Sequence, residues 1–184
     1  YSPHQHEVFD AFQYADSKGV LLVHAAGNDN ANVDSAPNYP TSLYSFQTKT
    51  LDHFLTIGAS TRFPKEMLAA SFSNYGQTRV DVFAPGYEIY NAVPQSDYKK
   101  LQGTSMAAPM VAGVAALLKS YFPALSMKEI KTIMLKSATS YKGTKQVKPG
   151  TEEELVDFAT LSATGAVINV KNAVKLCLEL EKMN

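Results

Sequence analysis

The chain has 184 residues, of which 45% are hydrophobic and 18% charged, and its 17 basic and 17 acidic residues leave no net charge. This composition is typical of one globular domain and excludes a disordered chain. The balanced charge gives no indication of a nucleic-acid partner or a polybasic membrane anchor. Cys177 is the only cysteine, so no internal disulfide forms, and its place in an apolar helical stripe favours a buried, inert thiol.

The first half of the chain predicts one helix and three buried strands. The helix occupies residues 3–18, with Ser2 as its N-cap, Pro3 at its first position and Gly19 at its end. The strands are expected at 20–27 (VLLVHAAG), 54–60 (FLTIGAS) and 80–86 (VDVFAPG). The first is apolar on both faces, the pattern of a parallel sheet covered by helices. Residues 29–52 are polar and predict a long surface loop.

The second half predicts three helices. The first begins near Thr104 and runs through small apolar residues. The second follows Ser126, which forms a capping box with Glu129, and the third begins near Val170 and is capped by Asn169. Residues 148–154 (KPGTEEE) predict a turn and 156–170 an extended segment. Alternating strands and helices predict an α/β fold, a three-layer sandwich with a mostly parallel sheet.

A membrane-helix protein is the weakest alternative. The longest apolar run, Met106 to Leu118, is shorter than the roughly 20 residues that span a bilayer, and it contains Pro109. Its small residues could pair two membrane helices, but they fit a buried soluble helix better.

Ser105 lies where a nucleophile is expected. It follows the Gly103–Thr104 turn at the start of a helix, whose N-terminus favours developing negative charge. The sequence GTSMA is close to the G-x-S-x-G motif of α/β-hydrolases, in which an acid and a histidine follow the serine. No histidine follows Ser105 and the only aspartate after it is Asp157, so that class is excluded.

Several segments resemble the subtilases, the subtilisin-like serine proteases. The segment 103–118 (GTSMAAPMVAGVAALL) resembles their serine signature, and 20–30 (VLLVHAAGNDN) resembles the segment that carries their oxyanion-hole asparagine. Residues 71–76 (SFSNYG), 80–86 and 164–174 (TGAVINVKNAV) resemble further segments in the same order. The chain is therefore similar to a subtilase over nearly its whole length.

The resemblance implies roles for five residues. Ser105 would be the nucleophile, and Asn28 would donate to the oxyanion together with the backbone N–H of Ser105. Ala25, Ala26 and Gly27 would line one wall of the pocket for the side chain before the scissile bond, and their small size would leave room for a large side chain.

The family's catalytic aspartate and histidine have no counterpart here. Their motifs, D-[ST]-G and H-G-T, precede the asparagine in the family, and neither occurs in this chain. We therefore expect residues 1–184 to be the C-terminal portion of a subtilisin-like peptidase domain, incomplete at its N-terminal side. Because a serine without its base retains little catalysis, we expect the chain alone to be inactive.

None of the four histidines lies in the H-G-T motif that surrounds the family's catalytic histidine. His4 and His6 are expected on a solvated helix, His53 at the surface, and His24 in a buried strand as a hydrogen-bonded structural residue more than as a substrate contact. Asp29, Asn30, Asn32 and Asp34 could ligate calcium, but clustered Asx residues more often form turns. No metal or cofactor is predicted for this chain.

The predicted activity is that of a serine endopeptidase acting through an acyl-enzyme on Ser105. A catalytically dead, subtilase-like binding or structural module is the alternative, and the intact Ser105 and Asn28 argue against it. Expected partners are peptide or protein substrates and the missing N-terminal part of the domain. A homodimer through an exposed sheet edge is also expected. The family resemblance implies a secreted, periplasmic or cell-surface location.

Overall fold

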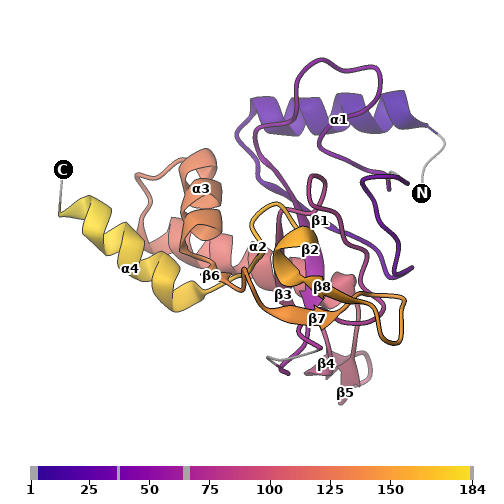
Figure 1. Ribbon diagram of the computed structural model, residues 1–184. Coiled ribbons are helices and arrows are strands. Elements are labelled where there is room, and N and C mark those ends of the chain that lie inside the picture. Colours follow the sequence, from indigo (N-terminus) through magenta and orange to yellow (C-terminus); the bar gives the residue numbers. More distant parts are fainter. Residues whose placement is uncertain (1–3, 37, 64–66, 183–184) are drawn as a thin grey trace.

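The computed structural model describes residues 4–36, 38–63 and 67–182, and its centre is a mostly parallel five-stranded sheet (Figure 1). The strands lie in the order β1-β2-β3-β9-β6. β1 to β3 and β9 run parallel, and β6 pairs antiparallel with β9. The sheet confirms the predicted α/β class, and it leaves β1 as an edge strand. The strand bounds are Leu22–Ala25 (β1), Phe54–Ser60 (β2), Val82–Pro85 (β3), Thr139–Ser140 (β6) and Ala166–Val167 (β9).

Three helices form the layer on one face of the sheet. α2 (Thr104–Tyr121) packs directly on β1, β2 and β3, and α3 (Met127–Ser137) and α4 (Val170–Glu181) pack beside it. Leu55, Ile57 and Ala59 of β2 point into this core, which also holds Cys177. Since burying one Leu or Ile side chain stabilises a fold by roughly 1.5–3 kcal/mol, this layer supplies much of the folding energy.

The opposite face is covered by α1 (Gln5–Ser17), by irregular chain and by the short 3-10 helix η1 (Phe158–Thr160). Phe54 packs against α1, and Phe83 of β3 lies 5.0 Å, ring to ring, from Phe158. Figure 1 shows α1 on the side of the strands away from α3 and α4. The sheet therefore lies between two layers, as the sequence predicts.

Several local predictions are confirmed. β2 has the predicted bounds, Ser126 and Glu129 form the capping box of α3, and the side chain of Asn169 caps α4. Cys177 is buried, and burial raises the pKa of its thiol. The predicted cap residues Ser2 and Pro3 lie outside the described residues, and α1 has His4 at its N-cap position.

Two hairpins and one irregular segment differ from the prediction. The pairs β4 (Ile89–Val93) with β5 (Asp97–Leu101), and β7 (Lys145–Val147) with β8 (Leu155–Asp157), have few buried side chains and hence no clear apolar alternation. Gln95 and Ser96 adopt positive φ in the turn between β4 and β5, at positions where Gly or Asn is usually found. Residues 156–170 are not one extended segment, because η1 and a turn interrupt them.

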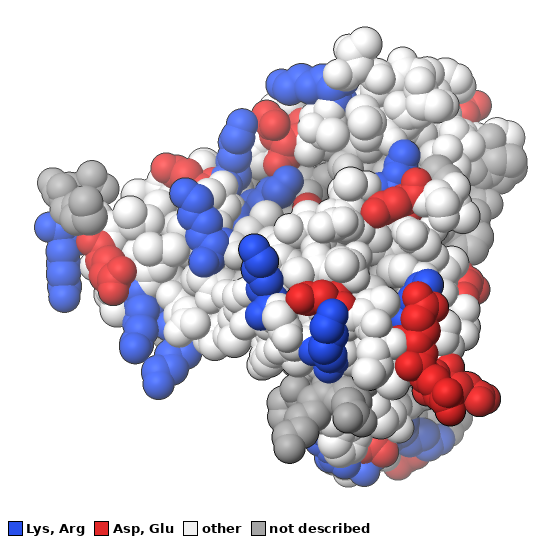
Figure 2. Space-filling view, in the orientation of Figure 1, with Lys and Arg blue, Asp and Glu red and all other residues white. Residues whose placement is uncertain are grey.

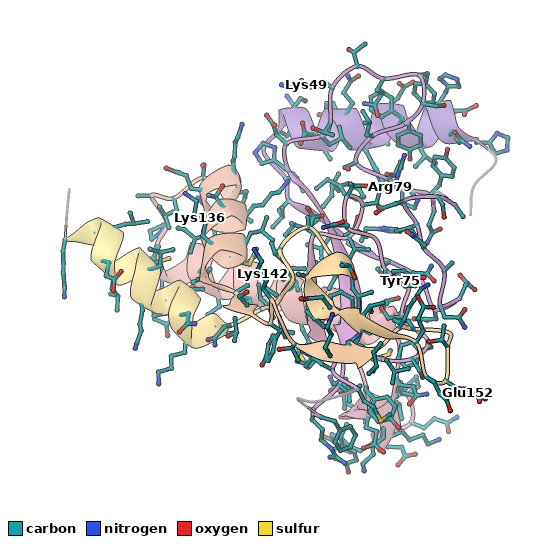
Figure 3. All side chains as sticks on the ribbon, in the orientation of Figure 1. Lys49, Tyr75, Arg79, Lys136, Lys142 and Glu152 are labelled. Carbon is teal, nitrogen blue, oxygen red and sulfur yellow. The ribbon has the colours of Figure 1, made fainter. Side chains whose placement is uncertain are left out.

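The surface carries both signs of charge. Figure 2 shows Lys and Arg gathered over α3 and α4, and a group of Asp and Glu near the opposite edge of this face. The exposed residues Glu152 to Glu154 lie in the loop between β7 and β8, and Figure 3 shows Glu152 pointing outward there and Lys136 on α3. Within the described ranges, no helix is long and apolar enough to cross a membrane.

Candidate active site

Ser105 lies in the first turn of α2, beyond the carboxyl ends of the parallel strands. Gly103, the N-cap residue, has φ 150°, and its N–H donates to Gly86 O at 2.8 Å. Gly86 N–H in turn donates to Ser60 O at 3.0 Å, so β2 and the end of β3 hold the turn. A Cβ on Gly86 would lie 2.7 Å from both Gly103 O and Ala59 Cβ, which explains the glycine. The result is an exposed serine on a rigid helix start.

Asn28 is oriented toward this turn by Thr104. Its Oδ1 accepts hydrogen bonds from Thr104 N at 2.9 Å and from Thr104 Oγ1 at 3.0 Å. Thr104 Oγ1 also accepts from Gly27 N at 3.1 Å. Because these bonds occupy the amide oxygen, the Nδ2 end of Asn28 is left as a donor, and a Cβ on Gly103 would lie 3.2 Å from it. The structure thus places a neutral donor beside the turn that presents Ser105.

The three predicted pocket residues join β1 to Asn28. Ala25 ends β1 and is half-buried against the α2 core, whereas Ala26 is fully buried in the core on the other face. Gly27 has φ 105° and needs glycine, because a Cβ there would run into the side chains of Asn74 and Asn38. Ala26 has no exposed surface, Ala25 and Gly27 are partly exposed, and none of the three lines the pocket beside Ser105.

A pocket of about 300 Å³ opens beside Ser105. Ile89, Asn91 and Leu101 of the β4–β5 hairpin form one side, and Ser105, Met106 and Met110 of α2 form the other. The sequence did not identify the hairpin residues as part of the site, because only tertiary structure brings the hairpin to α2. The pocket is mainly apolar and suits a hydrophobic side chain next to the nucleophile.

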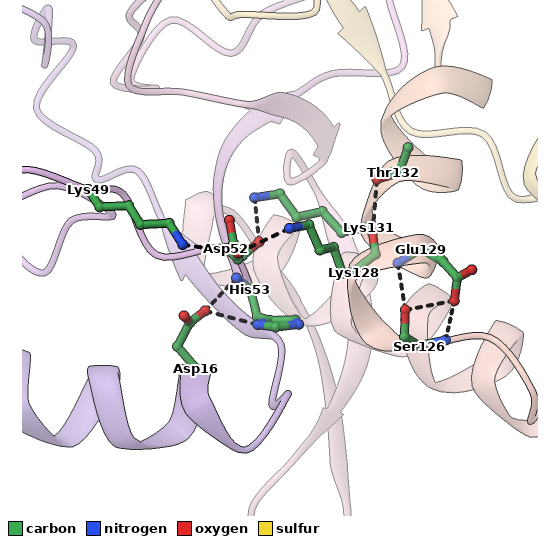
Figure 4. Close-up of polar contacts among 9 residues, drawn as sticks. All are labelled: Asp16, Lys49, Asp52, His53, Ser126, Lys128, Glu129, Lys131 and Thr132. Carbon is green, nitrogen blue, oxygen red and sulfur yellow. Dashed lines mark hydrogen bonds and ion pairs between the residues drawn. The ribbon is translucent and has the colours of Figure 1, made fainter.

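None of the four histidines lines this pocket. His53 and Asp16 form a pair, with His53 Nδ1 3.0 Å from Asp16 Oδ1, which Figure 4 shows at the end of α1. His53 directly precedes the first residue of the seven-residue strand β2, while Ser105 lies beyond the strand's other end. At about 3.3 Å per residue, the strand separates them by roughly 20 Å. The prediction that His53 lies at the surface is wrong, because its side chain is only 16% exposed.

His24 lies in β1 and lines a small pocket with Thr41, Thr56 and Arg79. Its Nδ1 is buried and has no hydrogen-bond partner among the described residues, so the expected hydrogen bonding is missing at this nitrogen. Burial lowers the pKa of His24 from 6.5 to about 4, so the ring is neutral near pH 7. It shares no pocket with Ser105.

Two of the Asx residues after Asn28, Asn32 and Asp34, hold this segment through hydrogen bonds. Asp34 accepts hydrogen bonds from Thr78 and from Arg79 N, and Asn32 Oδ1 accepts from Asp34 N. In the part of the chain that the structure describes, no group of three His, Cys, Asp or Glu residues is placed to hold a metal ion.

Comparison with known proteins agrees with this geometry. The sequence model of the Subtilase family (Peptidase_S8) matches residues 1–161. The chain is 40% identical to thermitase of Thermoactinomyces vulgaris over 134 residues, which are 73% of this chain and 42% of thermitase. It is 31% identical over 159 residues to Subtilisin-like protease 2 of Plasmodium falciparum, covering 83% of this chain and 10% of that protein.

A solved structure of the subtilase cytotoxin SubAB superposes with a TM-score of 0.79 at 20% identity, covering 99% of this chain and 57% of that chain. At that identity the likeness shows the fold. The chain spans less than half the length of thermitase and of Subtilisin-like protease 2. From the family match and the shared fold, the chain belongs to the subtilase family of serine proteases.

Proposed function

We propose that this chain supplies the nucleophile and the oxyanion donors of a serine endopeptidase. The observation that carries the proposal is the bonded set Gly27, Asn28 and Thr104, which leaves Asn28 Nδ2 as a donor next to the turn of Ser105. A binding module would have no need for a serine held at a helix start beside an oriented amide. The reaction that these groups support is acyl transfer.

In the proposed reaction, Ser105 Oγ attacks the carbonyl carbon of a peptide bond and gives its proton to a histidine base. The carbonyl oxygen becomes an oxyanion that accepts hydrogen bonds from Asn28 Nδ2 and from Ser105 N–H. When the C–N bond breaks, the amine leaves with the proton, and an ester on Ser105 remains. Water, deprotonated by the same base, hydrolyses the ester and frees Ser105. No cofactor takes part.

A base from outside these residues is supported by the pocket beside Ser105, which none of the four histidines lines. We infer that an upstream part of the domain carries the histidine and its aspartate, as the family resemblance implies. The same resemblance supports an exported enzyme with peptide or protein substrates. The chain alone is then expected to be inactive.

Two open surfaces support docking of this upstream part. Among the described strands β1 pairs only with β2, so no described strand covers its other edge. On α2, one face exposes Met110 (40%), Leu117 (40%) and Tyr121 (73%) around Gly113, beside whose Cβ position no atom lies within 4 Å. A helix with an apolar sequence on all sides is normally buried, so a strand on β1 and a helix on α2 would complete the fold. Without them, we expect the same surfaces to form a homodimer.

Labelling with a fluorophosphonate tests the proposal. The chain alone should show no rapid labelling of Ser105, and the chain mixed with the separately made upstream part should be labelled stoichiometrically. Ser105→Ala is the matched control for labelling at other serines. Fast labelling of the chain alone would disprove its inactivity, and a complemented, folded complex that is never labelled would disprove the proposed nucleophile.

A further inference from the structure

The segment that carries Asn28 has an irregular backbone whose polar groups need partners. Residues 26–31 leave β1 with positive φ at Gly27 (105°) and Asn30 (47°), and after the bond from Ala26 N to Ile57 O of β2 no helix or strand satisfies them. Their partners come largely from one buried residue, Asn74, whose exposed fraction is 2%. Asn74 lies between β2 and β3, 46 positions beyond Asn28 in the sequence (74 minus 28).

Asn74 bonds to the backbone on both sides of Asn28. Its Nδ2 donates to Ala26 O at 2.9 Å, and its backbone N–H donates to Gly27 O at 2.9 Å. Its Oδ1 accepts from Asp29 N at 3.0 Å and from Ala31 N at 2.9 Å. A planar amide that makes three side-chain bonds across this span leaves the backbone around Asn28 little freedom to rotate.

We propose that Asn74 is a positioning residue that fixes the backbone of the oxyanion donor Asn28. Thr104 holds the side chain of Asn28 from α2, and Asn74 holds the backbone of the residues before and after Asn28. The inference rests on the proposed function, because positioning matters only if Asn28 donates to an oxyanion. Gly27 fits the same role, since a Cβ there would collide with the Asn74 amide.

A purely structural role is less consistent with the neighbouring bonds. Residues 72–75 hold residues 30–33 through backbone bonds that need no Asn74 side chain: Asn30 N to Phe72 O, Tyr75 N to Ala31 O and Val33 N to Tyr75 O. Removing the amide would therefore leave this ladder in place. It would remove the side-chain bonds to Asp29 N and Ala31 N and one of the two bonds to Ala26 O, the other coming from Asn38 Nδ2, so the backbone on both sides of Asn28 would lose partners.

The experiment measures kcat and KM of Asn74→Ala and Asn74→Ser in the complete protease, with and without Asn28→Ala. Titration with the fluorophosphonate counts folded sites, so kcat is corrected for any loss of fold. Because misplacement by about 1 Å costs up to roughly 100-fold, we expect kcat per site to fall roughly 10-fold or more, with KM changing less than about 2-fold. In the Asn28→Ala background the same substitutions should change kcat less than about 2-fold.

Gln146→Ala is the matched control. Gln146 is also a buried amide, and its Oε1 accepts from Ala69 N at 2.7 Å, but it makes no bond to residues 26–31. The substitution Gln146→Ala should lower the melting temperature and leave kcat per site unchanged.

Equal losses from Asn74→Ala with and without Asn28 would overturn the inference, as would an unchanged kcat in both Asn74 variants. If Asn28→Ala itself left kcat unchanged, the proposed oxyanion function would fail instead.

Discussion

His24 makes the stability of this chain sensitive to acid. The His24 side chain, in β1, lies near Phe54, with 5.8 Å between ring centroids, and it lines a small pocket with Arg79. Burial lowers its pKa from 6.5 to about 4. The unfolded chain therefore binds a proton at His24 as pH falls through 6.5, while the folded chain does so only near pH 4.

The direction and size of the change in the free energy of unfolding follow from this difference between the folded and unfolded pKa of His24. Stability from the neutral ring is complete above pH 6.5 and is lost between pH 6.5 and about 4. A pKa difference of about 2.5, at about 1.4 kcal/mol per unit, gives a loss of about 3 kcal/mol. For a domain of this size, that corresponds to a fall in melting temperature of roughly 6–12 °C.

The assay is denaturant unfolding at one protein concentration between pH 7.5 and 4, for the natural chain and for His24→Leu. Leucine cannot titrate, and it also removes the unpartnered Nδ1. Over this pH range the free energy of unfolding of His24→Leu should fall by about 3 kcal/mol less than that of the natural chain. Asp81, a buried carboxyl whose pKa burial raises, titrates in both proteins and cancels in the comparison. Parallel pH curves for the two proteins would refute the reasoning.

Three further changes test the site and its surroundings. Thr104→Val removes one donor to Asn28 and the acceptor of Gly27 N, so kcat of the complete protease should fall roughly 10-fold while Thr104→Ser stays near the natural rate. Gly86→Ala forces a Cβ against Gly103 O at 2.7 Å and should lower the free energy of unfolding by roughly 1–3 kcal/mol in a denaturant titration. Gly113→Leu places a side chain in open space on α2, so it should not lower the melting temperature of the chain, but it should abolish complementation by the upstream part in the labelling assay. An unimpaired complex with Gly113→Leu would show that the helix docks elsewhere.

In subtilisin, a member of the same family, removing the oxyanion-hole asparagine costs about 10²–10³ in kcat. That figure comes from subtilisin and not from the geometry of this chain. It sets the scale against which Asn28→Ala should be judged in the complete protease.

Elements whose signals are local were predicted well. β2 is apolar at every position and has the predicted bounds, and the caps Ser126 and Asn169 depend on residues within three positions. The β4–β5 hairpin was not predicted, because its exposed strands show no alternation and Gln95 and Ser96 adopt positive φ without glycine. The burial of His53 was not predicted, because its partner Asp16 is 37 residues away in the sequence.

The sequence alone determined the family, through a serine signature and an asparagine segment, and it determined the apolar patterns that build the sheet and α2. These are local properties, since composition and periodicity act within one element. Only tertiary structure decided how Asn28 is held. Its partner Thr104 is 76 residues away, and Asn74 reaches its backbone across 43 to 48 residues. A hydrogen bond depends on distance in space, and here the order of the parallel strands creates that proximity.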